Sequence, residues 1–205
     1  MHSSWCWRKI IELKNDLKCK ITPRDFMAET CKIAEVYKIL TAPTESYHWS
    51  KQVWSRLNIP KHSFLIWLAV QDRLKTRERL FRFNVAAEAT CILCNDLNEN
   101  TSHLFFDCKF SQSCLSQIKV WLNWRVVSVS LQGLLRWINR SKASKFRRGI
   151  FAGTIAALVY HIWKARNLKL WQANTIDPDQ VVQEVKWQVK TRITYVMPKQ
   201  VLNTD

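Results

Sequence analysis

Glycine is scarce in this sequence, with three residues among 205. A loop that cradles phosphate groups through its backbone needs several closely spaced glycines, so this class of nucleotide-binding site is excluded. Long apolar runs are missing as well. The longest weakly polar stretch, residues 149–163, has 15 residues and contains His161, whereas a membrane-spanning helix needs about 20 apolar residues. We therefore expect a buried helix there and no membrane partner.

The start of the chain lacks the features of a secretory signal. Its first residues, Met-His-Ser-Ser-Trp, do not form a basic region followed by an apolar run. The seven cysteines are an odd number, which does not suit a complete set of intramolecular disulfides. We therefore expect an intracellular protein, in the nucleus or the cytoplasm, whose cysteines are metal ligands or core residues.

Acidic residues are absent from residues 111–176, although this segment carries eleven Lys and Arg residues. Residues 61–110, by contrast, hold seven basic and six acidic side chains, so the net charge of +16 is unevenly distributed. A basic surface without acidic neighbours is what binding to the phosphates of RNA or DNA requires. The predicted nucleic-acid contacts lie just before and at the start of a long helix: Arg140, Lys142, Lys145, Arg147 and Arg148.

The tryptophans of this basic segment have two interpretations. They could stack on nucleic-acid bases, or they could belong to the core beneath a solvated basic face. Burial is the usual environment of large aromatic side chains and is favoured for most of them. The residues concerned are Trp121, Trp124, Trp137, Trp163 and Trp171. The charge distribution is therefore the stronger indication of nucleic-acid binding.

What the sequence does contain is a pattern of metal ligands with the spacing C-x2-C-x8-H-x4-C. Its members are Cys91, Cys94, His103 and Cys108. Thiolate sulfur and imidazole nitrogen suit a tetrahedral Zn²⁺ ion, and four protein ligands are the complement of a closed structural site. The alternative is a group of ordinary buried thiols and a core histidine. Cys114 and His62 are spare candidates for one of the four positions.

Local details favour the zinc-knuckle interpretation. Asn95 follows the second cysteine, where a positive φ is often needed, and asparagine tolerates that conformation. Asn100 is a good helix N-cap, which predicts a short helix that begins near His103. Cys108 lies five positions beyond His103, which on a regular helix is about 140° around the axis. We therefore expect the helix to loosen or end before Cys108.

Hydrophobic periodicity predicts helices almost throughout the chain. The expected helices cover residues 5–17, 31–40, 49–57, 61–70, a short basic helix after 76, 115–124, 131–139, 144–172 and 178–196. The last one has a capping box, with Asp177 as the N-cap, Pro178 at the first helical position and Gln180 three residues beyond the cap. The fold class is therefore mainly α, a small zinc-stabilised helical domain followed by a C-terminal helical segment.

Two groups of apolar residues are expected to form the core. The first surrounds the zinc knuckle and comprises Trp54, Phe64, Trp67, Leu68, Leu80, Phe105 and Phe106. The second belongs to the C-terminal layer and comprises Ile155, Leu158, Val159 and Ile162. The helical spacing of these residues implies apolar helix faces that must pack against other parts of the protein.

Several motifs of the chain together resemble those of a known family. They are Trp54-Ser-Arg-Leu-Asn-Ile-Pro60-Lys61, Phe64-Leu-Ile-Trp67-Leu68-Ala69, Arg73-Leu74-Lys-Thr76-Arg77-Glu-Arg79-Leu80, Cys91-Ile-Leu-Cys94, Glu99 and His103-Leu104-Phe105-Phe106-Asp-Cys108. The stretch 54–121 is similar to the reverse transcriptase zinc-binding domain near the C-terminal end of the polyproteins of plant LINE-type (non-LTR) retrotransposons. Residues 4–9 and 162–167 resemble the flanks of that domain. All four ligand positions match, although Ile92, Asn95 and Asn100 stand where the family usually has Pro, Gly and Thr.

The resemblance, the charge distribution and the helical periodicity together predict three parts: an N-terminal helical flank at 1–30, a reverse transcriptase zinc-binding-like domain at 31–124, and a basic C-terminal helical region at 125–205. Nothing resembles the polymerase, because the sequence has no Tyr-x-Asp-Asp motif and no carboxylate cluster for two catalytic metals. Four protein ligands would also leave zinc no open position for a substrate.

We therefore expect a non-catalytic zinc-binding module derived from a retrotransposon polyprotein. It would bind RNA or DNA through a basic surface and would have no small-molecule substrate. The alternative is a degenerate structural or protein-interaction remnant that retains no nucleic-acid activity.

Overall fold

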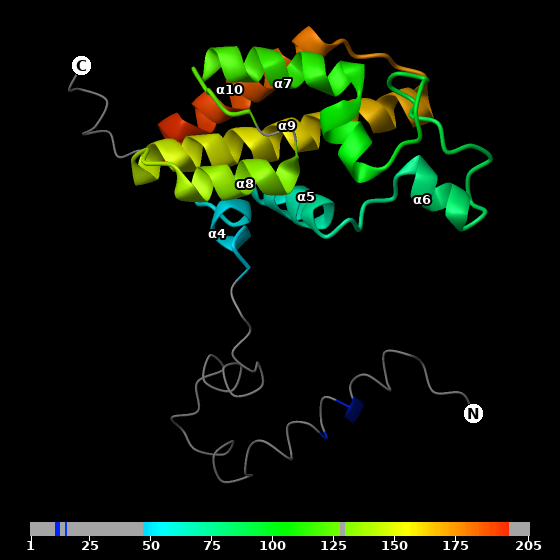
Figure 1. Cartoon of the computed structure of the whole chain (residues 1–205), viewed down its shortest axis with the longest axis horizontal. Coiled ribbons are helices and arrows are strands. Elements are labelled where there is room, and N and C mark those ends of the chain that lie inside the picture. Colours follow the sequence, from blue (N-terminus) through cyan, green and yellow to red (C-terminus); the bar gives the residue numbers. More distant parts are fainter. Residues whose placement is uncertain (1–10, 13–14, 16–46, 128–129, 197–205) are drawn as a thin grey trace. The chain divides into compact units, whose positions relative to one another are not determined.

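The computed structural model describes residues 11–12, 15, 47–127 and 130–196 (Figure 1). The chain forms two compact units, Met1–Tyr47 and His48–Asp205. The expected helices at 5–17 and 31–40 fall outside the described residues, except that residues 11, 12 and 15 are helical. The predicted domain boundaries after residues 30 and 124 rest on the family resemblance and on the charge distribution. They stay a prediction.

The described part of the second unit is built from helices. Their bounds are α4 Ser50–Val53, α5 Pro60–Val70, α6 Arg77–Arg82, a π-helical turn η1 His103–Asp107, α7 Lys109–Trp121, α8 Leu131–Arg140, α9 Lys145–Gln172 and α10 Pro178–Val196. The β structure of the described residues is limited to an isolated antiparallel bridge between Thr90 and Asn98. The mainly α fold class is therefore confirmed. No helix within the described residues combines the length and hydrophobicity needed to cross a membrane.

Helix α9 is the centre of this unit, because α4, α5, α7, α8, α10 and η1 all pack against it (Figure 1). The predicted contacts Ile155, Leu158, Val159 and Ile162 are each at most 3% exposed, which confirms them as core residues. Small side chains next to them, such as Ala152 and Ala156, let the neighbouring helices come close. The apolar run that the sequence shows at 149–163 is thus a helix surrounded by other helices.

Side-chain caps fix where the long helices begin. The Ser144 hydroxyl accepts a hydrogen bond from the backbone N–H of Arg147 at 3.1 Å, at the start of α9. The predicted capping box of α10 is present. Gln180 N–H donates to the Asp177 carboxylate at 2.8 Å, and Asp177 N–H donates to the Gln180 side chain at 3.3 Å. These bonds satisfy backbone donors that lack a partner within the helix.

The predicted core around the zinc knuckle is wrong for two residues. Phe105 and Phe106 are buried, but Trp54 is 55% exposed and Phe64 is 53% exposed. Trp67, Leu68 and Leu80 are partly buried. The reason is that α5 turns a mixed face towards the core, where its buried residues are His62, Ser63, Ile66 and Ala69. Phe64 therefore lies on the outer side of α5, whereas Trp67 packs partly against the core. Trp54 is not part of α5 and follows the end of α4.

Candidate metal centre

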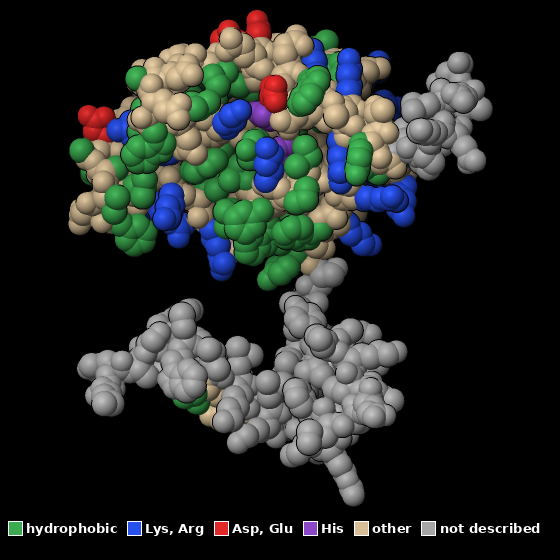
Figure 2. Space-filling view, turned by 180° about the vertical axis from the view of Figure 1, so that it is seen from behind, with side chains coloured by type: hydrophobic (Ala, Val, Ile, Leu, Met, Phe, Trp, Pro, Cys, Tyr) green, Lys and Arg blue, Asp and Glu red, His purple; other side chains and the backbone are tan. Residues whose placement is uncertain are grey.

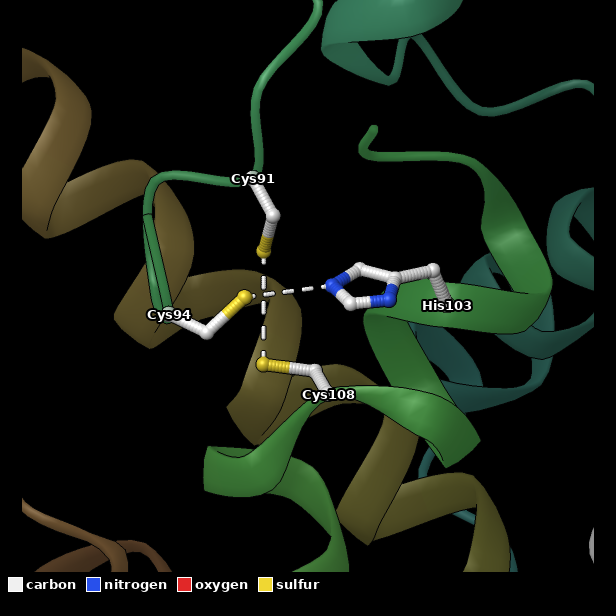
Figure 3. A group of neighbouring side chains, drawn as sticks. All are labelled: Cys91, Cys94, His103 and Cys108. Atoms are coloured by element: carbon white, nitrogen blue, oxygen red, sulfur yellow. Dashed lines mark hydrogen bonds between the residues drawn. The ribbon is translucent and has the colours of Figure 1, made fainter. Parts of the chain in front are cut away.

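The two cysteines of the C-x2-C pair lie in a short hairpin loop. Cys91 N–H donates to the Leu97 carbonyl at 2.8 Å, next to the bridge between Thr90 and Asn98. The loop then turns, and Asn95 N–H donates to the Cys91 carbonyl at 2.8 Å. Asn95 has a φ of 55°, as predicted from its tolerance of the left-handed conformation. The turn therefore lets the two sulfur atoms converge on a common centre (Figure 3).

A π-helical turn positions the other two ligands. The Asn100 side chain accepts a hydrogen bond from His103 N–H at 2.8 Å, which confirms the predicted N-cap. Cys108 N–H then donates to the His103 carbonyl at 2.8 Å, a bond between residues five apart. Such a wider turn brings positions i and i+5 towards one face, which a regular α-helix does not. The expected loosening before Cys108 is thus confirmed, and Ser111 Oγ satisfies the freed Leu104 carbonyl at 2.5 Å.

The four predicted ligands meet at one point (Figure 3). Cys91 Sγ lies 4.0 Å from Cys108 Sγ, and Cys94 Sγ lies 3.3 Å from His103 Nε2. All four ligand atoms lie within 4.8 Å of one another. Cys91 and Cys108 are fully buried, His103 is 5% exposed, and Cys94 is partly buried at the rim. The cluster can therefore hold one metal ion, away from bulk water on most sides.

The donor set and the spacing fit Zn²⁺. A tetrahedral zinc with Zn–S of about 2.3 Å and Zn–N of about 2.0 Å separates its ligand atoms by roughly 3.5–3.8 Å. The Cys91 Sγ–Cys108 Sγ distance of 4.0 Å and the Cys94 Sγ–His103 Nε2 distance of 3.3 Å bracket that range. Three thiolates and one imidazole are a common complement of structural zinc sites. Small movements of the side chains towards the centre would complete the tetrahedron.

The electrostatics of the thiols also favour a cation. The pKa of Cys108 is lowered, above all by its hydrogen bond to Cys91 and further by backbone N–H groups at the start of α7. The same hydrogen bond, together with burial, raises the pKa of Cys91. The two pKa shifts have opposite signs because Cys91 donates this hydrogen bond and Cys108 accepts it. A metal ion that binds thiolates would replace the proton of this hydrogen bond.

Neither spare ligand candidate belongs to the cluster. The Cys114 thiol is buried against the Pro178 carbonyl at 3.7 Å, and burial raises its pKa to about 12. His62 is 1% exposed and packs against Tyr160 and His161 of α9. Both are therefore core residues, which leaves the ligand set that the sequence spacing predicts.

A buried ion pair ties the knuckle to α9, and reasoning from the sequence did not predict it. Glu99 is 0% exposed and Arg166 is 2% exposed. Their closest atoms, Glu99 Oε1 and Arg166 Nη2, are 2.7 Å apart, and Arg166 Nε also donates to the carboxylate. Glu99 Oε1 further accepts the backbone N–H of Arg77 at 2.9 Å, so the start of α6 is held as well. Both residues belong to the motifs that carry the family resemblance, but their 67-residue separation gives no local sign of pairing.

The predicted nucleic-acid contacts surround the connection between α8 and α9. Four of them are exposed and Arg148 is partly buried. Arg148 Nη1 donates to the Asn139 carbonyl at 3.4 Å, and the Arg147 guanidinium lies over the Phe151 ring at 5.6 Å. In the described part of the chain, no acidic side chain forms a salt bridge with any of the five. Whether they bind nucleic acid stays a prediction.

Comparison with known proteins bears on the metal-binding segment. The searches of curated proteins and of solved structures returned no match. A family model described as zinc-binding in reverse transcriptase matches residues 32–114. This match contains all four cysteine and histidine ligands and ends within α7, so α8, α9 and α10 lie beyond it. The segment that brings the metal ligands together is therefore similar to the zinc-binding region of reverse transcriptases.

Proposed function

We propose that this chain is a non-catalytic, zinc-stabilised module that binds RNA or DNA through the basic surface at the α8–α9 connection. The observation that carries the proposal is the charge distribution. Eleven basic and no acidic residues occur between positions 111 and 176, and Arg166 is the one of them that is buried and paired with Glu99. The five predicted contacts have no acidic salt-bridge partner among the described residues. Such cations are available to replace the counterions of phosphate groups.

Zinc has a structural role in this proposal. When bound, it would supply folding free energy by joining the hairpin loop, η1 and the start of α7. Four protein ligands fill a tetrahedral coordination shell, which leaves no position for a reactive water. The proposal therefore assigns no catalytic step to the metal and no small-molecule substrate to the protein.

The proposal also covers origin and location. The match to reverse transcriptases supports derivation from a retrotransposon polyprotein, and the motifs at 54–121 suggest a plant LINE-type element. A reducing compartment, the nucleus or the cytoplasm, would keep the ligand cysteines available for metal.

The salt dependence of binding tests this function. The fluorescence anisotropy of labelled nucleic acid would measure the binding of the zinc-loaded chain to 30-nucleotide single strands and to a 30-base-pair duplex. The measurement would be repeated at NaCl concentrations between 25 and 250 mM. Each neutralised phosphate contributes a log–log slope of roughly −0.7 to −0.9. The variant with Gln at the five positions Arg140, Lys142, Lys145, Arg147 and Arg148 should flatten the slope by several units.

A second variant controls for the loss of net charge. It carries Gln at five basic positions outside the acid-free segment: Arg73, Lys75, Arg82, Lys186 and Lys190. The slope of this control should change by less than about one unit, because these residues are not assigned to the surface. Equal slopes for the two variants, or no binding at 25 mM NaCl, would contradict the proposed function.

The alternative function is that of a structural or protein-interaction remnant. One observation favours it, an exposed aromatic cluster on the outer side of α5. The Trp67 ring lies 6.4 Å from Trp54 and 5.6 Å from Phe64 between ring centroids, and the latter two are more than half exposed. Contiguous exposed apolar groups are typical of binding surfaces. Absence of salt-dependent binding would support this alternative.

A further inference from the structure

A groove lies next to the predicted contacts, between α4, the end of α8 and the first turns of α9. Its volume is about 1090 Å³. Ile138 and Ala152, both nearly fully buried, provide apolar surface within it. Two of the five predicted contacts, Lys145 and Arg148, line the groove, whereas the other three do not. The groove therefore separates the basic surface into an inner and an outer part.

The walls of the groove are basic. Lys51 and Arg56 from the α4 region face the same space as Lys145 and Arg148 from α9. None of the described residues that line the groove is acidic, and none of these four cations has an acidic salt-bridge partner in the described part of the chain. Figure 2 likewise shows a face of the molecule on which Lys and Arg side chains outnumber acidic ones. The groove thus has the charge that a polyanion requires.

Two aromatic side chains line the same groove and are open to solvent. Trp54 is 55% exposed and Phe146 is 41% exposed. Trp54 packs on Trp67 on one side, so its ring is supported rather than free. Exposed aromatic rings beside cations are the elements with which proteins stack unpaired bases and hold the backbone of a single strand.

A buried amide adds an unused hydrogen-bond acceptor. Gln52 lines the groove and is 7% exposed. Its Nε2 donates to Asn139 Oδ1 at 3.3 Å, whereas its Oε1 is buried and has no partner among the described residues. Buried polar atoms normally have a partner. The Gln52 side chain thus joins α4 to the end of α8 beside the groove.

Close packing fixes the two walls relative to each other. A Cβ at Gly149 would lie 2.9 Å from Leu57 Cδ1, and one at Gly153 would lie 3.4 Å from the Leu57 carbonyl. The chain after α4 thus approaches α9 at positions without a side chain. Asn58 holds the same turn, because its side chain donates to the Gln52 and Val53 carbonyls at 3.0 and 2.9 Å. The groove is therefore a built feature rather than a gap between mobile loops.

We infer that this groove is a binding site for single-stranded nucleic acid, with phosphates held by Lys51, Arg56, Lys145 and Arg148. The bases stack on Trp54 and Phe146. This inference rests on the proposed function and names its substrate class. A duplex suits the groove less well, because paired and stacked bases do not offer their faces to the two rings.

Two matched triple variants test the inference on the full zinc-loaded chain. The groove variant carries Lys51→Gln, Arg56→Gln and Lys145→Gln, and the outer variant carries Arg140→Gln, Lys142→Gln and Arg147→Gln. Both lose three charges. The probes are labelled eight-nucleotide strands, (dT)8 and (rU)8, which are short enough to report on one site. The groove variant should lose about two units of salt slope and bind at least about tenfold more weakly, and the outer variant should lose less than one unit.

The stacking part has its own test. Trp54→Ala should weaken single-strand binding at least about fivefold and leave the salt slope and the affinity for a duplex unchanged, because the residue carries no charge. Trp54→Phe should retain most of the affinity. Trp187→Ala, at a position that is 61% exposed on α10, is the matched control and should have no effect. Circular dichroism and zinc content confirm that each variant is folded.

The outcomes separate the two proposals. The groove inference would be overturned if the groove and outer variants lost the same affinity for the short strands, or if Trp54→Ala bound them as tightly as the unmodified chain. The proposed function would still stand in that case, provided that the 30-nucleotide strands bound in a salt-dependent way. Absence of binding to every strand would overturn both. A larger loss for (rU)8 than for (dT)8 in the groove variant would support the inference and assign the groove to RNA, and the reverse would assign it to DNA.

Discussion

The metal centre and the groove differ in how their polar residues are held. At the metal centre the ligand atoms lie within 4.8 Å of one another, and beside it the fully buried Glu99 meets Arg166 at 2.7 Å. In the groove, Lys145 and Lys51 are exposed, no acidic side chain of the described residues pairs with them, and Trp54 is 55% exposed.

This difference separates residues that stabilise the fold from residues that are available to a partner. A buried charge without its partner is strongly unfavourable, so each polar group near the metal centre is required by its neighbours. Exposed charges of one sign contribute little to stability or oppose it slightly. Substitutions should therefore have large effects on unfolding in the first region and small ones in the second.

Loss of the metal should have the largest effect on stability. Cys91→Ser removes a buried ligand, and we expect zinc to be lost and the segment from the hairpin loop to the start of α7 to unfold, because a closed zinc site contributes folding free energy directly. Zinc per chain and hydrogen exchange of residues 88–114 would measure this. A chelator should have the same effect on the unmodified protein.

Cys114→Ser is the matched control for the ligand substitution. Its thiol is also buried but lies outside the cluster, so one zinc per chain should remain. Cys6→Ser and Cys19→Ser should also leave the zinc content unchanged. Loss of zinc from Cys114→Ser with retention in Cys91→Ser would show that the ligand set is wrong.

Breaking the buried ion pair should have the next largest effect. Glu99→Ala leaves the Arg166 guanidinium buried without its carboxylate, and removal of one partner of such a pair costs about 3–5 kcal/mol of unfolding free energy. Urea unfolding measures the loss. The double variant Glu99→Leu with Arg166→Met should lose less than Glu99→Ala alone, because no charge stays buried.

An exposed ion pair near the same loop provides the control. Lys109 Nζ lies 3.5 Å from Asp96 Oδ2, with side chains that are 84% and 55% exposed. Lys109→Gln should change the unfolding free energy by less than about 1 kcal/mol, since exposed pairs contribute little. Similar losses for Lys109→Gln and Glu99→Ala would contradict the contrast between buried and exposed charges.

Acid should destabilise the core between α5 and α9 through His62. Burial, and then the charges of His161 and Lys61, lower the pKa of His62 to about 3 from its ordinary value of 6.5. Below pH 6.5, His62 therefore binds a proton in the unfolded chain, whereas in the folded chain it stays neutral until the pH approaches 3. The contribution of neutral His62 to the free energy of unfolding is therefore fully present above pH 6.5. It is lost as the pH falls towards 3, by up to about 1.4 kcal/mol per pH unit.

Urea unfolding at pH 7.5 and pH 5.0 would measure this contribution. The difference between the two pH values should be smaller in His62→Gln than in the unmodified chain by about 2 kcal/mol, because the titrating group is gone. Zinc release in acid affects both proteins equally and cancels in this comparison. His48→Gln, whose residue is exposed, should behave like the unmodified chain. Equal pH dependence of all three would refute the role of His62.

Removal of charges from the groove should have the smallest effect on stability. Lys51→Gln combined with Lys145→Gln deletes two cations without acidic partners, and we expect a change in unfolding free energy of less than about 0.5 kcal/mol. The same urea measurement applies. A loss as large as that of Glu99→Ala would mean that these lysines belong to the structural part of the molecule.

The sequence predicted the geometry of the Cys and His cluster well because its determinants are local. The ligand spacing, the positive φ of Asn95 and the Asn100 cap each depend on residues a few positions apart, and each matches the structure. The capping box of α10 is local in the same way. The mainly α fold class also followed from the periodicity of the helices, which depends on neighbours in sequence.

Features that depend on distant residues were not predictable. Glu99 and Arg166 are 67 positions apart, and the groove joins Lys51 and Trp54 to Lys145, about ninety positions later. Periodicity shows that a helix has an apolar side but not which neighbour covers it. Phe64 was therefore expected inside, although α5 meets α9 with the side that carries His62.

X-ray absorption spectroscopy at the zinc edge, with metal content measured on the same purified sample, tests the metal centre most directly. The four ligands predict one zinc per chain, with three sulfur atoms at about 2.3 Å and one nitrogen at about 2.0 Å. Cys108→Ser should reduce the sulfur number or abolish binding. A zinc content near zero in the folded chain, or a first shell dominated by oxygen, would contradict the Cys91, Cys94, His103 and Cys108 site.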